Sequence, residues 1–371
     1  MSLKKVPLLV LLATCLAAGS AHAQLRIGMP SGFTGAVAAG VKENAAGAEL
    51  YIDAVNSRGG VHGQPIELIK ADDQFNPKRT PEVARELIEK QQVLALFLNR
   101  GTPHSQALLP LLEEHKIALV APSTGAMLLH QPVNPWVFNV RATYQREAAR
   151  AIEHLGVIGL TRIGIVVTDD SFGADAAVGA LKGFEKVRLT PIINTKFARE
   201  NPDLPPIAVQ LKAAQTQAVM VVGSVANVVN MVKAIRAAGS QAQVVTLSNN
   251  ASEGFIKQLG EHARGVVVSQ VFPNERSLTY PLIKEAIELA RAKGQDGVSP
   301  AMMEGFAAAK VLVEGLRRAG PNPTRLTLKS ALESIERYDL GGLTMSYGPG
   351  NHTGLDFADL SIVDSSGRFR R

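Results

Sequence analysis

Small polar side chains follow five apolar segments of the chain, and these residues are its best candidates for chemistry. Hydroxyl, amide and guanidinium groups bind an anionic group through hydrogen bonds and charge. The candidate ligand-binding residues, including two aromatic residues nearby, are Arg100, Thr102, Ser123, Thr124, Tyr144, Phe172, Ser224, Asn249 and Asn250. Together they predict a binding site for a small molecule.

Each candidate also has an ordinary structural explanation. A Ser, Thr or Asn before a helix is most often an N-cap that contributes about 1 kcal/mol to the helix. Of Ser123 and Thr124, one can cap a helix while the other faces a cleft. Arg100 fits a solvated surface as well as an anion clamp, Phe172 fits a core, and Tyr144 fits a packed hinge. For single residues these alternatives stay open.

The chain lacks the short motifs of common enzyme classes. No G-x-G-x-x-G follows a strand, and no G-x-x-x-x-G-K-[ST], G-x-S-x-G or H-E-x-x-H occurs. The eight histidines are scattered singly, without metal-ligand spacing. Asp72–Asp73 and Asp169–Asp170 are acidic neighbours whose side chains point apart. We expect a protein that is not an enzyme, with no catalytic residue, metal site or cofactor.

The elements that must position these residues alternate between strands and helices. Helices are expected at 42–57, 78–91, 280–293, 299–318 and 325–336, and strands at about 25–29, 65–70, 93–98, 117–121, 162–167, 218–222, 243–247 and 265–269. The strands are continuously apolar, which predicts parallel sheets covered on both faces. Ligands bind beyond the carboxyl ends of such strands, where helix N-termini offer free N–H groups.

Three extended segments interrupt this rhythm and predict two lobes that the chain visits twice each. They lie at 131–144, 270–277 and 338–349. About 348 residues would follow an N-terminal leader of 23, which is long for one core. The expected fold class is α/β, with two Rossmann-like doubly wound lobes joined by three crossovers. The predicted division is 24–141 plus 272–341 for lobe 1, and 142–271 plus 342–371 for lobe 2.

The first 23 residues have the layout of a secretory signal peptide. Lys4 and Lys5 precede an apolar run that is too short to span a bilayer, and Ala21-His22-Ala23 fits a cleavage site. The only cysteine, Cys15, lies here, and lipid anchoring through it is the less favoured alternative. We expect cleavage after Ala23 and a periplasmic protein.

Charge and hydropathy exclude two classes of partner. The formal net charge is +6, or about +4 without Lys4 and Lys5, and no basic run precedes the first strand. This balance does not indicate nucleic-acid binding. No later segment has the roughly 18 uninterrupted apolar residues of a transmembrane helix.

Four motifs carry a resemblance to a known family. They are Gly28–Gly35 (GMPSGFTG), Asn56–Gly63 (NSRGGVHG), Asp72-Asp73 before Asn76-Pro77, and Pro122-Ser-Thr. From about residue 25 to 369 the chain resembles the solute-binding proteins of ABC transporters, in the type I group related to the leucine/isoleucine/valine-binding protein. The resemblance implies two lobes that close like a hinged trap over a solute, a monomer, and delivery of the solute to a membrane permease.

The resemblance also implies roles for the candidate residues. Thr102 matches a position that places a hydroxyl on the ligand carboxylate, and Ser123 and Thr124 match the loop that holds the carboxylate and the ammonium. Phe172 matches a tyrosine of the amino-acid binders, and Ser224 or Val225 matches a second aromatic position. Those binders use a second-lobe glutamate against the ligand ammonium, and here the loop reads Ser248-Asn249-Asn250.

The class of ligand and the role of the protein each have two alternatives. Branched-chain amino acids are the default ligands, and an aromatic or aliphatic acid, or an amide, is the alternative. Asp169, Asp170 or Glu253 could still supply the missing charge. A ligand-sensing subunit for a receptor or kinase is the alternative role.

Overall fold

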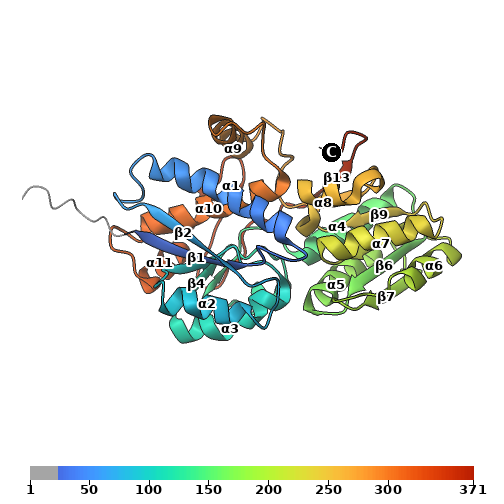
Figure 1. The fold of residues 1–371 in the computed structure, drawn as a ribbon, viewed down its shortest axis with the longest axis horizontal. Coiled ribbons are helices and arrows are strands. Elements are labelled where there is room, and N and C mark those ends of the chain that lie inside the picture. Colours follow the sequence, from blue (N-terminus) through green and yellow to red (C-terminus); the bar gives the residue numbers. More distant parts are fainter. Residues whose placement is uncertain (1–23) are drawn as a thin grey trace, which may run out of the picture.

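The computed structural model describes residues 24–371, and its elements form two sheet-centred lobes lying side by side (Figure 1). The predicted signal peptide and its cleavage site lie outside these residues. No helix within 24–371 is long and apolar enough to cross a membrane. The same residues hold no group of three or more His, Cys, Asp or Glu that could bind a metal ion.

The first lobe is built on a parallel five-stranded sheet in the order β2-β1-β3-β4-β5. The strands are β1 (Leu25–Ser31), β2 (Ile66–Asp72), β3 (Ala95–Phe97), β4 (Ala118–Val120) and β5 (Val137–Phe138). One face packs against α1 (Ala38–Asn56), α9 (Pro281–Ala292), α10 (Pro300–Arg318) and α11 (Arg325–Glu333), and the other against α2 (Thr80–Glu89) and α3 (Thr102–His115). Both faces are therefore covered, as the apolar strands predict.

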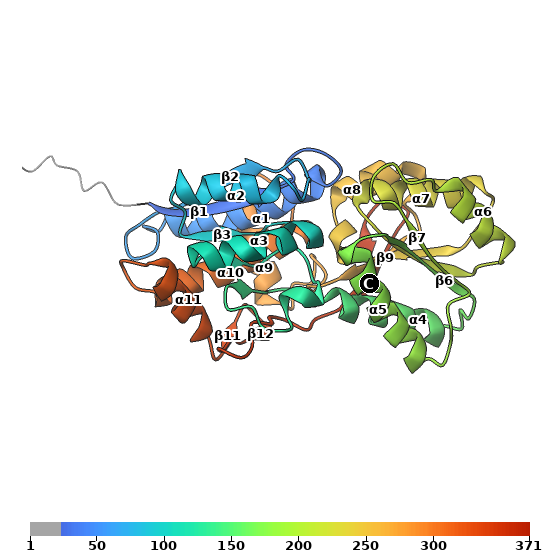
Figure 2. The ribbon, with the colours of Figure 1, turned by 90° about the horizontal axis from the view of Figure 1, so that it is seen from below.

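Helices α1 and α10 come from opposite ends of the sequence and pack together closely (Figures 1 and 2). A Cβ atom on Gly47 would lie 1.9 Å from the carbonyl oxygen of Met302, and one on Gly305 would lie 1.8 Å from that of Asn44. Only glycine fits at these two positions. The contact packs α10 into the first lobe.

The second lobe contains a seven-stranded sheet in the order β14-β13-β10-β9-β8-β6-β7. Its parallel strands are β6 (Ile163–Thr168), β7 (Ile193–Phe197), β8 (Ala218–Val222), β9 (Gln243–Thr246) and β10 (Val267–Gln270). Helices α4 (Tyr144–Val157) and α5 (Ser171–Lys186) pack on one face, and α6 (Pro205–Ala213), α7 (Val225–Ala237) and α8 (Glu253–Leu259) on the other. The two-lobed α/β fold is confirmed.

Two features of the second sheet differ from the sequence expectation. Strands β13 (Asp359–Val363) and β14 (Phe369–Arg370) add an antiparallel edge to the otherwise parallel sheet. Strand β7 was not predicted, because its residues alternate between partly buried and exposed instead of forming an apolar run. Because β7 was not predicted, the loop that follows it was not considered as part of the site.

The third extended segment is a hairpin on the first lobe, so the expectation that it crosses between lobes is wrong. Strands β11 (Tyr338–Asp339) and β12 (Thr344–Met345) pair around Gly341 and Gly342, whose φ angles are +117° and +92°. Farther on, Tyr347 and Leu355 are buried in the first-lobe core. This packing favours a crossing after Leu355, and we propose that lobe boundary in place of the predicted one at 341/342.

Candidate functional site

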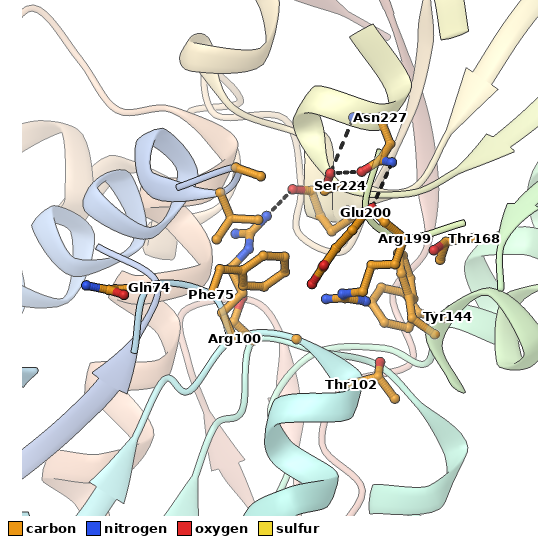
Figure 3. Close-up of a pocket in the computed structure, with 16 residues that line it drawn as sticks. Gln74, Phe75, Arg100, Thr102, Tyr144, Thr168, Arg199, Glu200, Ser224 and Asn227 are labelled. Carbon is orange, nitrogen blue, oxygen red and sulfur yellow. Dashed lines mark hydrogen bonds between the residues drawn. The ribbon is translucent and has the colours of Figure 1, made fainter. Parts of the chain in front are cut away.

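A cavity of about 170 Å³ lies between the two lobes, beyond the carboxyl ends of their strands (Figure 3). It is similar in size to an apolar cavity of about 150 Å³ that holds one benzene molecule. Seven of the nine predicted site residues line it: Arg100, Thr102, Ser123, Tyr144, Phe172, Ser224 and Asn249. The fold thus brings loops from both lobes to one small-molecule-sized space.

The other two predicted residues are fully buried behind the cavity wall. The Thr124 hydroxyl lies 2.8 Å from the Thr102 hydroxyl. The Asn250 amide donates to the Thr246 hydroxyl at 2.9 Å. Neither residue lines the cavity, so their direct contact with a ligand is not supported. Thr124 instead orients Thr102, whose proton is available to a ligand whenever Thr124 donates to it.

Arg100 is the buried cation of the cavity. It lies between β3 and α3, forms a β-bridge with Ser123, and is 4% exposed. Its guanidinium donates to the Asn44 side-chain oxygen at 3.2 Å and to the Asn249 carbonyl of the other lobe. Within residues 24–371 no carboxylate oxygen lies within 4.0 Å of it. Burial lowers the pKa of Arg100, yet an arginine stays charged in proteins, so this cation lacks an anionic partner.

Aromatic side chains form the walls on either side of Arg100. The Phe75 ring stacks on the His104 ring at 4.3 Å between centroids. From the second lobe, the Arg199 guanidinium lies 4.9 Å from the centroid of Phe75, a cation–π contact across the lobe boundary. Tyr144 and Phe172 make a second aromatic pair at 4.7 Å. These rings give the cavity apolar wall segments next to its polar lining residues.

Two predicted residues of the second lobe act as helix caps or loop anchors as well as lining the cavity. The Ser224 hydroxyl accepts from the Asn227 backbone N–H at 3.3 Å and caps α7. The Asn249 amide donates to the Gly223 carbonyl at 3.0 Å. For Ser224 the cap and site interpretations therefore both hold geometrically. These hydrogen bonds fix the orientation of the Ser224 and Asn249 side chains.

The acidic residues proposed from sequence as partners of an ammonium group do not line the cavity. Asp170 caps α5 through the N–H groups of Phe172 and Gly173, at 3.0 Å each, and forms an ion pair with Arg199. Asp169 pairs with Lys196 at 2.9 Å on the surface. Glu253 is likewise absent from the lining, and the acid that lines the cavity is Glu200.

Sequence reasoning missed several lining residues. They are Ala36, Val37, Gln74, Phe75, Gly101, Thr168, Arg199, Glu200 and Asn227. Gln74 and Phe75 lie inside the Asp72–Pro77 motif, so that motif was a usable signal. Arg199 and Glu200 follow the unpredicted strand β7, and they reach into the cavity opposite Arg100 and Phe75 (Figure 3).

A second buried arginine, Arg141, lies near the cavity at the junction of the lobes. It forms ion pairs with Glu147 of α4 and, at 3.6 Å, with Glu304 of α10. It also donates to the Ser248 hydroxyl at 2.6 Å. Burial opposes the charge of Arg141, but Glu147 and Glu304 outweigh it and raise the pKa of the guanidinium. This cluster ties both lobes to the loop that carries Asn249.

Known proteins share this architecture over nearly the whole chain. A model of the periplasmic binding protein family matches residues 24–363. A Leu/Ile/Val-binding protein homolog 3 from Brucella melitensis is 24% identical over 356 residues, covering 94% of this chain and 93% of the relative. The crystal structure of a substrate-binding periplasmic protein from Ralstonia solanacearum is 30% identical with a TM-score of 0.84, covering 93% of this chain and 99% of the other.

A more distant structure shares the fold. The fatty acid ABC transporter substrate-binding protein from Thermomonospora curvata is 19% identical with a TM-score of 0.80, covering 93% of this chain and 89% of the other. The family match extends over both lobes and every strand that carries a cavity loop. This chain belongs to the periplasmic binding protein family, as a distant homologue of the Leu/Ile/Val-binding proteins, and the family is one of binding proteins and not of enzymes.

Proposed function

We propose that this protein captures a small carboxylate-bearing solute by closing its two lobes over it and then delivers the solute to an ABC permease at the membrane. It acts as a monomer in the periplasm, after removal of the signal peptide behind Ala23. Branched-chain amino acids are the default class of solute. Aromatic and aliphatic acids and amides are the competing class.

The observation that carries the proposal is the unpaired guanidinium of Arg100 in the cavity. A buried charge without a partner is costly, and a ligand carboxylate would supply the partner that residues 24–371 do not. Thr102 and Ser123 add hydroxyl donors beside it. The N-terminus of α3, which begins at Thr102, adds the positive end of a helix dipole.

The names of the relatives support a carboxylate as the shared group. Leucine, isoleucine and valine carry a carboxylate and an ammonium, whereas a fatty acid carries a carboxylate alone. For an ammonium group, Glu200 is the acid available from the second lobe. The ligand's anionic end therefore docks on the first lobe, and its other groups contact the second.

Lobe closure is supported by polar contacts that join the lobes directly. The carboxylate of Glu43 on α1 accepts from the backbone N–H groups of Glu253 and Gly254 at 3.2 and 3.0 Å. Arg100 donates to Asn249, and Arg199 covers Phe75. A solute that touches both lobes favours this closed arrangement by its differential affinity for the closed and open states.

A thermal-shift screen of amino acids, their deaminated analogues and aromatic acids tests the proposal. A true ligand at 100 times its dissociation constant stabilises the protein by about 2.7 kcal/mol. For any hit, Arg100→Gln should weaken binding by about 2–5 kcal/mol, or at least about 30-fold, in calorimetry. Arg150→Gln removes the same charge from an exposed site and should leave affinity unchanged. A hit that binds Arg100→Gln as tightly as the unsubstituted protein would remove the carboxylate clamp from the proposal.

A further inference from the structure

An open groove of about 690 Å³ adjoins the ligand cavity on the second lobe. Four residues, Ala36, Arg199, Glu200 and Asn227, line both the groove and the cavity. Ala36 belongs to the first lobe and the other three to the second, so the two spaces meet at the boundary between the lobes. These four residues stand between the two spaces, and a solute tail that passes among them would reach the groove.

The groove beyond this junction is uncharged and carries amide groups. Ala226, Asn230 and Ala234 lie four residues apart on one face of α7, where the small alanines leave room. The side chains of Asn201 and Asn230 line the groove, and among residues 24–371 neither has a side-chain hydrogen-bond partner. An asparagine amide presents both a donor and an acceptor, and so matches another amide. The only charged lining residues, Arg199 and Glu200, lie at the junction.

At the junction, Arg199 is held by several contacts, whereas Glu200 is not. Arg199 is held by its ion pair with Asp170 and by its contact with Phe75. The Asn227 amide donates to the Arg199 carbonyl at 3.3 Å. Glu200 is exposed and has no ion pair or side-chain hydrogen bond within the described chain. It can turn aside toward water without breaking an ion pair or a side-chain hydrogen bond within residues 24–371.

We propose that the site accepts carboxylic acids with a neutral, amide-bearing tail, and that the tail leaves the cavity past Glu200 and binds in the groove beside Asn201 and Asn230. This inference rests on the proposed function, because the carboxylate end still docks on Arg100. The cavity of about 170 Å³ holds the acid end, and the groove holds the part that the cavity has no room for. The solute class therefore extends beyond single amino acids.

The test measures the dissociation constants of N-acetylalanine, N-acetyl-dialanine and N-acetyl-trialanine by calorimetry. All three carry a free carboxylate and no ammonium, and each step adds one alanine residue and with it one tail amide. We expect affinity to rise about tenfold from the first to the third, the effect of one or two added hydrogen bonds. Asn230→Trp, which fills the groove from an exposed position, should abolish this gain and leave N-acetylalanine within about threefold of its original affinity.

Lys233→Trp is the matched control, because Lys233 is exposed on α7 but does not line the groove. It should preserve the gain with length. The inference is overturned if affinity is flat or falls along the series, if Asn230→Trp leaves the gain intact, or if none of the three binds while other acids do. Failure of every carboxylate to bind in an Arg100-dependent way would instead overturn the proposed function.

Discussion

Two buried arginines near the lobe junction differ in the partners of their positive charge. Arg141 is 1% exposed and is paired with Glu147, Glu304 and Ser248. Arg100 is 4% exposed, and within residues 24–371 its guanidinium donates to the uncharged oxygens of Asn44 and Asn249 and forms no ion pair. A buried cation whose partners come from its own chain stabilises the fold. A buried cation without a carboxylate partner is the basis of the ligand site proposed for Arg100.

Breaking the paired cluster is expected to have the largest effect. Arg141→Leu leaves Glu147 and Glu304 buried without their cation, and should lower the free energy of unfolding by about 3–5 kcal/mol. Urea denaturation measures this, with Arg150→Leu on the exposed face of α4 as the control. A loss below about 1 kcal/mol would contradict a structural role for the cluster.

The buried His104 differs from both arginines because it stays neutral, and this makes its contribution to stability depend on pH. Burial lowers the pKa of His104 to about 4, and neither ring nitrogen has a hydrogen-bond partner within the described residues. Between pH 6.5 and about 4 the unfolded chain binds a proton on His104 that the native protein does not. The free energy of unfolding should therefore fall by at most about 3 kcal/mol as pH is lowered through this window.

The variant His104→Phe should remove that part of the pH dependence and keep the stack on Phe75. The pKa of His130 is also lowered by burial to about 4, so the slope should shrink without vanishing. The measurement is the free energy of unfolding at several pH values. If its slope against pH is the same in His104→Phe as in the unsubstituted protein, His104 is not neutral in the native state.

Removing the unpaired cation should affect folding far less than removing the paired one. In the absence of ligand, Arg100→Gln is expected to change the free energy of unfolding by less than about 1 kcal/mol, in either direction, because relief of the buried charge offsets two lost hydrogen bonds. The same urea experiment measures it. A loss as large as that of Arg141→Leu would mean that Arg100 is structural, and the contrast between the two arginines would fail.

The smallest expected effect concerns the charge opposite Arg100. Glu200→Gln should weaken the binding of leucine by about 0.3–1 kcal/mol more than that of 4-methylpentanoate, its deaminated analogue. The effect is small because Glu200 is exposed and its charge is screened. Calorimetry with both solutes measures the difference. Equal effects on the two would exclude Glu200 as the partner of an ammonium group.

The sequence predicted most of the fold because its signals are local. Eight strands and five helices were placed within a few residues of their observed bounds, from apolar runs and helical periodicity. Strand β7 was missed because a half-exposed strand has no such run, and the Asp339–Met345 hairpin was mistaken for a lobe crossing because both are extended. Seven of nine candidate residues line the cavity because strand-end loops can be located from the strands themselves.

The sequence by itself determined the alternation of strands and helices and the two-lobed class, and it carried the motifs that resemble the family. Only the tertiary structure decided which arginine has a carboxylate partner, since Arg141 and Glu304 are brought together from distant parts of the chain. It also decided that Thr124 and Asn250 lie behind the wall while Phe75, Arg199 and Glu200 face the cavity. Burial and charge pairing depend on contacts between remote segments, and no local pattern records them.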